Sequence, residues 1–198
     1  LSADIFGLQE ITSSSDFNQL INKINNLDSL DQWIGFRAGD GGYQELAYII
    51  NTSLVNIIDT PYSILNEYDH YFAYRKPYVI KILYMNNEFI IINNHYKCCG
   101  DGSIEIDFWD EEYRRQQASI FLKNYIDINF PNDNVIVIGD MNDELDDAID
   151  DNIFLNFIQD NANYKIVDMD IALGSSANWS YPGWPSHLDH ILITNELF

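Results

Sequence analysis

The chain has 198 residues, a usual length for one domain, and its 46% apolar and 21% charged residues are typical of a globular protein rather than a disordered one. Its 31 acidic and 10 basic side chains give a formal net charge of −21, which excludes a basic clamp that binds nucleic acid by neutralising many phosphates. A phosphate ester is not excluded as a substrate, because a bound divalent cation can supply local positive charge.

Strands and helices alternate along the sequence. A first apolar run over 6–10 predicts a strand that ends at Glu10. Several of the strand-like runs are apolar on both faces, so we expect their sheets to be covered on both sides. The remaining runs rich in β-branched and aromatic residues, each bounded by turn residues, predict strands at 33–37, 45–51, 55–58, 78–84, 88–94, 134–139 and 189–194.

Helical periodicity is clear in two places. Apolar residues recur at helical spacing over 17–24, and the serines that begin at Ser13 can cap this helix. A second apolar stripe covers 118–126 and is stopped by Pro131, and a third, weaker pattern predicts a helix at 153–158. Together with the strands, these helices predict one mixed α/β domain with buried sheets and outer helices.

Two segments carry unusual residues outside the predicted elements. The segment 173–185 is rich in Gly, Ser, Asn and Trp and predicts a long loop, in which Trp179, Tyr181 and Trp184 either line a substrate rim or pack under the loop. The adjacent cysteines at 98–99 match neither a disulfide framework nor a zinc spacing. We expect two small buried side chains there, with a vicinal disulfide or two free thiols as the alternatives.

Several apolar strands end in a carboxylate, an amide or an imidazole. These end residues are Glu10, His95, Asp140 and Asn142. If the strands pack side by side, their polar ends converge, and converging carboxylates repel one another unless a cation lies among them. Each residue alone has a structural interpretation: Glu10 as a helix cap, Asp140 and Asn142 as an Asx turn, and His95 as a buried structural histidine.

Taken together and in this order, the strand ends form a pattern of known motifs. The Gly-Asp-Met-Asn element at 139–142 follows a four-residue apolar strand and is the most specific of them, and the others are Leu-Gln-Glu at 8–10, Asn-Asn-His at 93–95 and Leu-Asp-His-Ile-Leu at 188–192. The pattern resembles the endonuclease/exonuclease/phosphatase superfamily. Tyr-Gln-Glu at 43–45 and Arg-Lys-Pro at 75–77 resemble elements of its deoxyribonuclease I-like branch, although that branch has an acid where Lys76 stands.

This resemblance implies a four-layered α/β sandwich, with two packed mixed β-sheets, helices on the outer faces and a shallow site at the rim. It implies that a divalent cation, Mg²⁺ or else Mn²⁺ or Ca²⁺, is held by Glu10. It implies that Asp140 and Asn142 position water and phosphate, and that His95, oriented by Glu45, donates a proton or a hydrogen bond. It also implies that Asp189 pairs with a second histidine. The substrate contacts that it implies are Arg75, Tyr43 and Asn94.

The chain also departs from the pattern of the superfamily. We expect residues 1–198 to be a single domain that lacks the first strand of the family, which ends in Asn, and its C-terminal Ser-Asp-His segment. Neither His187 nor His190 replaces the missing histidine, so we expect this chain alone to have little turnover. The resemblance also favours an exported protein, because nucleases of this type are often secreted.

Three classes of function follow from these residues. The first is a divalent-metal-dependent phosphodiester hydrolase, an endonuclease acting on DNA or RNA. The second is a phosphatase or phosphodiesterase acting on a small molecule or a lipid head group, which the charge of −21 favours because a polyanion is repelled at long range. The third is a non-catalytic binding module of the same fold, which has no need to keep like-charged carboxylates together.

Overall fold

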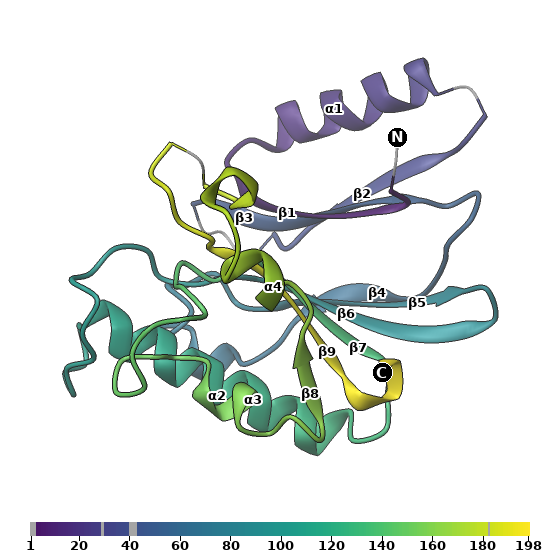
Figure 1. Cartoon of the computed structure of the whole chain (residues 1–198). Helices are drawn as coiled ribbons and strands as arrows, with labels where there is room; N and C mark the ends of the chain where they lie inside the picture. Colours follow the sequence, from purple (N-terminus) through teal and green to yellow (C-terminus); the bar gives the residue numbers. More distant parts are fainter. Residues whose placement is uncertain (1–2, 29, 40–42, 182) are drawn as a thin grey trace.

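A computed structural model of the chain describes residues 3–28, 30–39, 43–181 and 183–198. Two β-sheets face each other, with helix α1 outside one of them and helices α2 and α3 outside the other (Figure 1). The structure therefore confirms the predicted four-layered α/β sandwich. Among the described residues, no helix is both long enough and apolar enough to cross a membrane.

The smaller sheet has three antiparallel strands in the order β1-β3-β2. Its strands are β1 (Ile5–Ile11), β3 (Glu45–Asn51) and β2 (Trp33–Arg37). The helix α1 (Ser14–Leu27) covers its outer face and buries Phe17 against Trp33. As predicted, Ser13 caps this helix, because its hydroxyl accepts a hydrogen bond from the backbone N–H of Asp16 at 3.2 Å.

The larger sheet has six strands in the order β4-β5-β6-β7-β9-β8. Only the β6–β7 pair is parallel, and α2 forms the connection between these two strands. The bounds of its strands are β4 (Asn56–Ser63), β5 (Tyr78–Tyr84), β6 (Asn87–His95), β7 (Val135–Asp140), β8 (Tyr164–Ile166) and β9 (Asp189–Thr194). The bounds of the remaining helices are η1 (Asn66–Tyr68), α2 (Glu111–Asn129), α3 (Leu155–Ile158), α4 (Met169–Ala172), η2 (Ser176–Asn178) and η3 (Asn195–Leu197).

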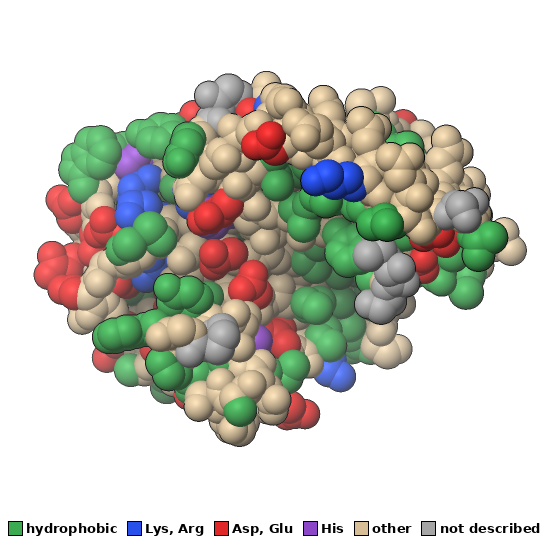
Figure 2. All heavy atoms as spheres, turned by 90° about the horizontal axis from the view of Figure 1, so that it is seen from above, with side chains coloured by type: hydrophobic (Ala, Val, Ile, Leu, Met, Phe, Trp, Pro, Cys, Tyr) green, Lys and Arg blue, Asp and Glu red, His purple; other side chains and the backbone are tan. Residues whose placement is uncertain are grey.

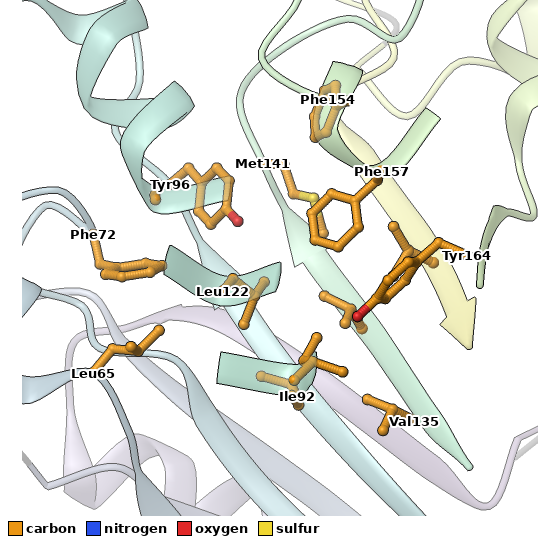
Figure 3. Close-up of a cluster of buried hydrophobic side chains, with 14 of the residues drawn as sticks. Leu65, Phe72, Ile92, Tyr96, Leu122, Val135, Met141, Phe154, Phe157 and Tyr164 are labelled. Atoms are coloured by element: carbon orange, nitrogen blue, oxygen red, sulfur yellow. The ribbon is translucent and has the colours of Figure 1, made fainter. Parts of the chain in front are cut away.

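The largest apolar cluster lies between the six-stranded sheet and α2. Ile92 of β6, Val135 of β7 and Leu122 of α2 meet there, with Phe154 and Phe157 beside them (Figure 3). Burying these side chains contributes roughly 1.5–3 kcal/mol each relative to leaving them exposed. This cluster fixes β6 and β7, whose ends carry the predicted site residues.

Polar groups join the two sheets across their shared interface. Asn93 of β6 is fully buried and donates to the backbone oxygens of Leu8 at 3.0 Å and Ala47 at 3.1 Å, and its Oδ1 accepts from Gln9 Nε2 at 2.7 Å. Tyr48 of β3 donates its hydroxyl to backbone oxygens of the facing sheet. These bonds set the position of β1 against β6.

The predicted elements agree with the structure except where they are short or at an edge. The run predicted at 55–58 becomes a longer strand, β4, that continues through Pro61, because β4 lies at the edge of its sheet, where the missing N–H of proline need not break a ladder. The short elements β8 and α4 were not predicted from the sequence. The segment 173–185 is a loop around η2, apart from residue 182, which lies outside the described residues.

Candidate active site

The ends of three neighbouring strands place His95, Asp140 and Asp189 side by side. His95 pairs with Asp140 in the β6–β7 register, and Asp140 pairs with Asp189 in the β7–β9 register. Directly opposed residues of adjacent strands point to the same face of a sheet, and here that face looks towards the smaller sheet. Glu10 arrives there from β1, with its Oε1 3.9 Å from His95 Nε2, and Asp140 Oδ2 lies 3.7 Å from the same nitrogen.

Gly139 makes the β6–β7 alignment possible. Its φ of 136° lies in a region of backbone conformation that residues other than glycine rarely adopt. A Cβ at this position would lie 2.0 Å from the backbone oxygen of Asn94. The glycine of the Gly-Asp-Met-Asn element is therefore needed for the close approach of the two strands that carry His95 and Asp140.

Two of the site residues have a left-handed backbone. Glu10 has a φ of 59° at a bulge in β1, and Asn142 has a φ of 54° just after β7. The backbone N–H of Asn142 donates to Asp140 Oδ1 at 3.0 Å, which is the Asx turn considered from the sequence, and Asn142 Nδ2 donates to the oxygen of Tyr96 at 3.2 Å. Strained conformations of this kind gather at functional sites.

The site carries uncompensated negative charge. Burial raises the pKa of Asp140 to about 6, and the charge of Asp189 adds to the rise. Burial and the nearby Arg75 lower the pKa of His95 to about 3, so its ring is neutral at physiological pH. Among the described residues, His95 is the only basic side chain within 4.0 Å of the carboxylates of Glu10 and Asp140.

Arg75 binds the backbone at the end of β6. Its Nε donates to the backbone oxygen of His95 at 3.2 Å and its Nη2 to that of Tyr96 at 2.6 Å, while Nη1 lies 3.4 Å from Gln44 Oε1. Burial lowers the pKa of Arg75, and the charges of Asp140 and other acidic groups oppose that effect. The structure thus gives Arg75 a positioning role, and its contact with a substrate phosphate stays a prediction.

Two sequence predictions differ from the structure. The pattern implied that Glu45 orients His95, but the Glu45 carboxylate lies 2.6 Å from Arg37 Nε, and His95 Nδ1 is buried without a partner among the described residues. Glu45 shares the α1-facing side of β3 with Ala47, whereas His95 faces the space between the sheets. The strand alternation therefore separates the two side chains.

Asn94 is the second of these differences. It was predicted to contact the substrate, yet it is fully buried and follows Ile92 on the face of β6 that packs towards α2. Its Nδ2 donates to the oxygen of Ile92 at 3.1 Å, and its Oδ1 has no partner among the described residues. As placed here, Asn94 does not reach the rim.

The other predicted residues are accessible. Tyr43 is 78% exposed, next to residues that are not described, and Asp189 is exposed at the start of β9. The backbone N–H of Asp189 donates to Ser180 Oγ at 3.1 Å. In the long loop, Tyr181 and Trp184 are both exposed rather than packed under the loop, and their lining of a substrate rim stays a prediction. The face of the molecule that is seen from above in Figure 2 carries several acidic side chains, with basic and hydrophobic ones beside them.

A buried cluster beside the site was missed from the sequence. Asp168 Oδ2 accepts from His187 Nε2 at 2.9 Å and from His190 Nδ1 at 2.7 Å, and His190 Nε2 donates to the oxygen of Asp143 at 2.8 Å. Burial raises the pKa of Asp168, but hydrogen bonds from His190 and from a backbone N–H outweigh it and set this pKa below its usual value. Two histidines flanking Asp189 were the only sequence signal of the cluster.

The cluster at Asp168 has a spacing that could hold a metal ion, since the three ligating groups lie within 4.8 Å of one another. Its hydrogen bonds favour a metal-free state. His187 Nδ1 accepts from the backbone N–H of Ser180 at 3.3 Å, so the ring proton sits on Nε2, which is the nitrogen that a metal would need. The cluster therefore anchors the start of β9.

The two cysteines do not behave as expected. Cys98 and Cys99 are both exposed and free, and their Sγ atoms are 2.9 Å apart. The expectation of two small buried side chains is wrong. The loop that carries them leaves the core after Tyr96, and Arg115 donates to the backbone oxygens of Lys97 and Cys99 at 2.9 and 2.7 Å.

This fold and rim define a phosphoesterase-like α/β sandwich, and the comparisons agree with that class. The model of the Endonuclease/Exonuclease/phosphatase family matches residues 1–198, so the chain belongs to this family. A comparison of the sequence with curated proteins gives no match.

Solved structures of the same fold cover nearly all of this chain. TDP2 of D. rerio in complex with a single-strand DNA product has a TM-score of 0.65 and 13% identity, over 98% of this chain and 71% of that one. The human Nocturnin catalytic domain with a bound sulfate has a TM-score of 0.62 and 16% identity, over 97% and 69%. An endonuclease/exonuclease/phosphatase from Bacteroides vulgatus has a TM-score of 0.61 and 11% identity, over 97% and 73%.

Proposed function

We propose that this chain is a divalent-cation-dependent phosphodiester hydrolase that acts on nucleic acid. The observation that carries the proposal is the meeting of Glu10 and Asp140, from two different sheets, within 4 Å of the same imidazole nitrogen of His95. Family membership supports a phosphoesterase, and it argues against a binding module of the same fold.

The donor set fits a hard divalent cation. The groups are carboxylate oxygens, and the raised pKa of Asp140 reflects burial and the charges of Asp189 and Glu10, which nothing nearby fully offsets. Glu10 is the ligand we assign, because its carboxylate is exposed at the rim. A bound Mg²⁺ or Mn²⁺ would polarise a phosphoryl oxygen and stabilise charge on the leaving oxygen.

Residues of the chain position the water, the phosphate and the leaving group. Asp140, with a pKa near 6, is mostly ionised at neutral pH and can accept a proton from water held beside it. Asn142, fixed by its bond to Asp140, can orient water or phosphate through its amide. The neutral His95 ring serves as a hydrogen-bond donor to a phosphate oxygen or to the leaving group.

Substrate contacts are assigned to fewer residues than the sequence suggested. Arg75 and the exposed Tyr43 keep this role, while Asn94 loses it because its buried side chain turns away from the rim. Glu45, predicted to orient His95, is bound to Arg37 instead. Nucleic acid is favoured as the substrate class by the relatives, of which the D. rerio TDP2 structure holds a single-strand DNA product.

We also propose that this chain alone turns over slowly. Strand β1, which carries Glu10, pairs only with β3 among the described residues, so its other edge has unpaired backbone groups. A strand added at this edge would hold Glu10 more firmly.

The test separates cation binding from turnover. Mn²⁺ binding to the chain is measured by calorimetry, and Glu10→Gln should weaken it by more than about tenfold, while Glu67→Gln, an exposed control on η1, should not. Plasmid nicking is then compared for the chain and for a longer polypeptide, with Mg²⁺ and with EDTA. Nicking that persists in EDTA, or Mn²⁺ affinity that is unchanged in Glu10→Gln, would refute the proposal.

A small phosphate ester or lipid head group is the second candidate substrate. The net charge of −21 favours it, because an acidic protein repels a long polyanion at range. Hydrolysis of duplex DNA, single-stranded DNA, sphingomyelin and inositol phosphates under the same conditions distinguishes the two candidates.

A further inference from the structure

An aromatic surface lies beside the candidate active site and has no part in the roles assigned so far. Tyr74, Phe108 and Trp109, which we call the aromatic platform, are 54%, 49% and 65% exposed. Tyr74 comes from the turn before β5, and the other two come from the loop before α2. Large aromatic rings gathered on a surface mark interaction sites more often than isolated exposed ones do.

The aromatic platform is built on one buried ring. His70 is only 8% exposed, and its ring stacks on Phe108 with centroids 3.7 Å apart and planes at 6°. Trp109 packs edge-on against it at 5.1 Å and Tyr74 at 6.0 Å. His70 Nε2 donates to the Phe108 oxygen at 2.6 Å, which leaves Nδ1 to accept from the Tyr74 hydroxyl at 3.4 Å.

Arg114 holds the base of this assembly. Its Nε and Nη2 donate to the backbone oxygen of His70 at 3.1 and 2.6 Å. Tyr74 itself has a φ of 63°, a conformation that costs of order 1–3 kcal/mol in a residue with a side chain. The rings are therefore held in place before any ligand arrives, which lowers the entropy lost on binding.

The aromatic platform continues into the site through Arg75. Tyr74 is the residue before Arg75, whose guanidinium binds the backbone oxygens of His95 and Tyr96. Among the described residues, Arg75 forms no ion pair, although the protein carries a net charge of −21. Positive charge next to exposed rings is the arrangement that binds single-stranded nucleic acid, with phosphates on the cations and bases on the rings.

We propose that Tyr74, Phe108 and Trp109 form a stacking subsite for unpaired bases of a single-stranded nucleic acid whose phosphate lies at the candidate active site. Bases in a duplex hide their faces in the stack, so this subsite selects single strands, ends or gaps. The inference rests on the proposed function for the reaction itself but concerns binding, which can be measured alone.

The experiment compares two probes that share the same phosphates. Fluorescence anisotropy in EDTA, where no cation supports turnover, gives affinities for a labelled 12-nucleotide oligothymidylate and for an abasic oligomer of the same length. The ratio of the two affinities isolates the bases, because charge repulsion from the acidic site acts on both probes. We expect wild-type protein to prefer oligothymidylate by tenfold or more.

The variants assign this preference to the aromatic platform. Trp109→Ala should reduce the affinity ratio about tenfold and leave binding of the abasic oligomer unchanged. Trp109→Phe should keep most of the affinity ratio. Tyr62→Ala, which removes an exposed ring on the edge strand β4, should not change the affinity ratio. Equal affinities of wild-type protein for the two probes, or an unchanged ratio in Trp109→Ala, would overturn the inference. Cation-independent nicking with the ratio intact would instead defeat only the proposed function.

Discussion

Asn93 is the residue whose replacement best tests how the fold builds the site. Its fully buried amide donates to Leu8 and Ala47 and accepts from Gln9, so it joins β6 to two strands of the facing sheet, β1 and β3. Asn93→Leu keeps the branched heavy-atom shape of the side chain and removes all three bonds. Glu10 follows Leu8 and Gln9 in β1, so the change should also loosen Glu10 relative to His95.

The loss in free energy of unfolding follows from the hydrogen bonds that Asn93→Leu removes. Leaving a buried acceptor unsatisfied costs about 1–3 kcal/mol, and two backbone oxygens are affected, so the free energy of unfolding should fall by about 2–6 kcal/mol. For a chain of this size each kcal/mol lowers Tm by roughly 2–4 °C, which gives a fall on the order of 10 °C.

Thermal unfolding followed by circular dichroism measures this change. Asn134→Leu is the matched control, because its amide donates to the oxygen of Glu88 at an exposed turn, and its Tm should move by no more than about 2 °C. The Mn²⁺ affinity of Asn93→Leu should fall below that of the control. A Tm equal to that of the control would show that the Asn93 bonds do not hold the sheets together.

Three further changes test other parts of the structure. Arg115→Leu leaves Asp143, which its Nε binds at 2.8 Å, as an uncompensated buried charge and should lower the stability by about 3–5 kcal/mol in chemical denaturation; a change below about 1 kcal/mol would contradict this. Gly139→Ala forces a Cβ against Asn94 and should weaken Mn²⁺ binding as well as lower Tm, whereas a loss of Tm alone would mean that the β6–β7 alignment does not control the site. Burial and a hydrogen bond with Asp143 raise the pKa of Asp147 to about 7, so the protonated form stabilises the fold at acidic pH and this contribution is lost as the pH rises through 7. The Tm of Asp147→Asn relative to that of wild type should therefore increase from pH 5 to pH 8. A constant difference in Tm would argue against the raised pKa.

The strand ends were predictable because they combine two local signals. A short apolar run predicts a strand, and the abrupt polar residue after it predicts where the strand reaches the rim. This reasoning singled out Glu10, His95 and Asp140, and the structure brings the carboxylates of Glu10 and Asp140 within 4 Å of His95 Nε2. Their distances could not be predicted, because they depend on the register of β6 with β7 and on the bulge in β1.

The residues that the sequence misplaced share one physical cause. Glu45 begins a strand that is buried on both faces, and Asn94 is the residue before the last of another, so hydrophobic alternation does not show which side chains face the site. The cluster around Asp168 was missed for a different reason, because its two histidines lie 19 and 22 residues away and meet it only when β9 forms.

The sequence by itself determined the longer strands and helices in chain order, the cap at Ser13 and the polar strand ends, since each depends on neighbours a few residues apart. Only the tertiary structure decided that Arg37 rather than His95 binds Glu45, that Arg75 supports the end of β6, and that an aromatic platform flanks the rim. These features arise from contacts between strands and loops distant in the chain, and packing of the two sheets, not local propensity, sets their geometry.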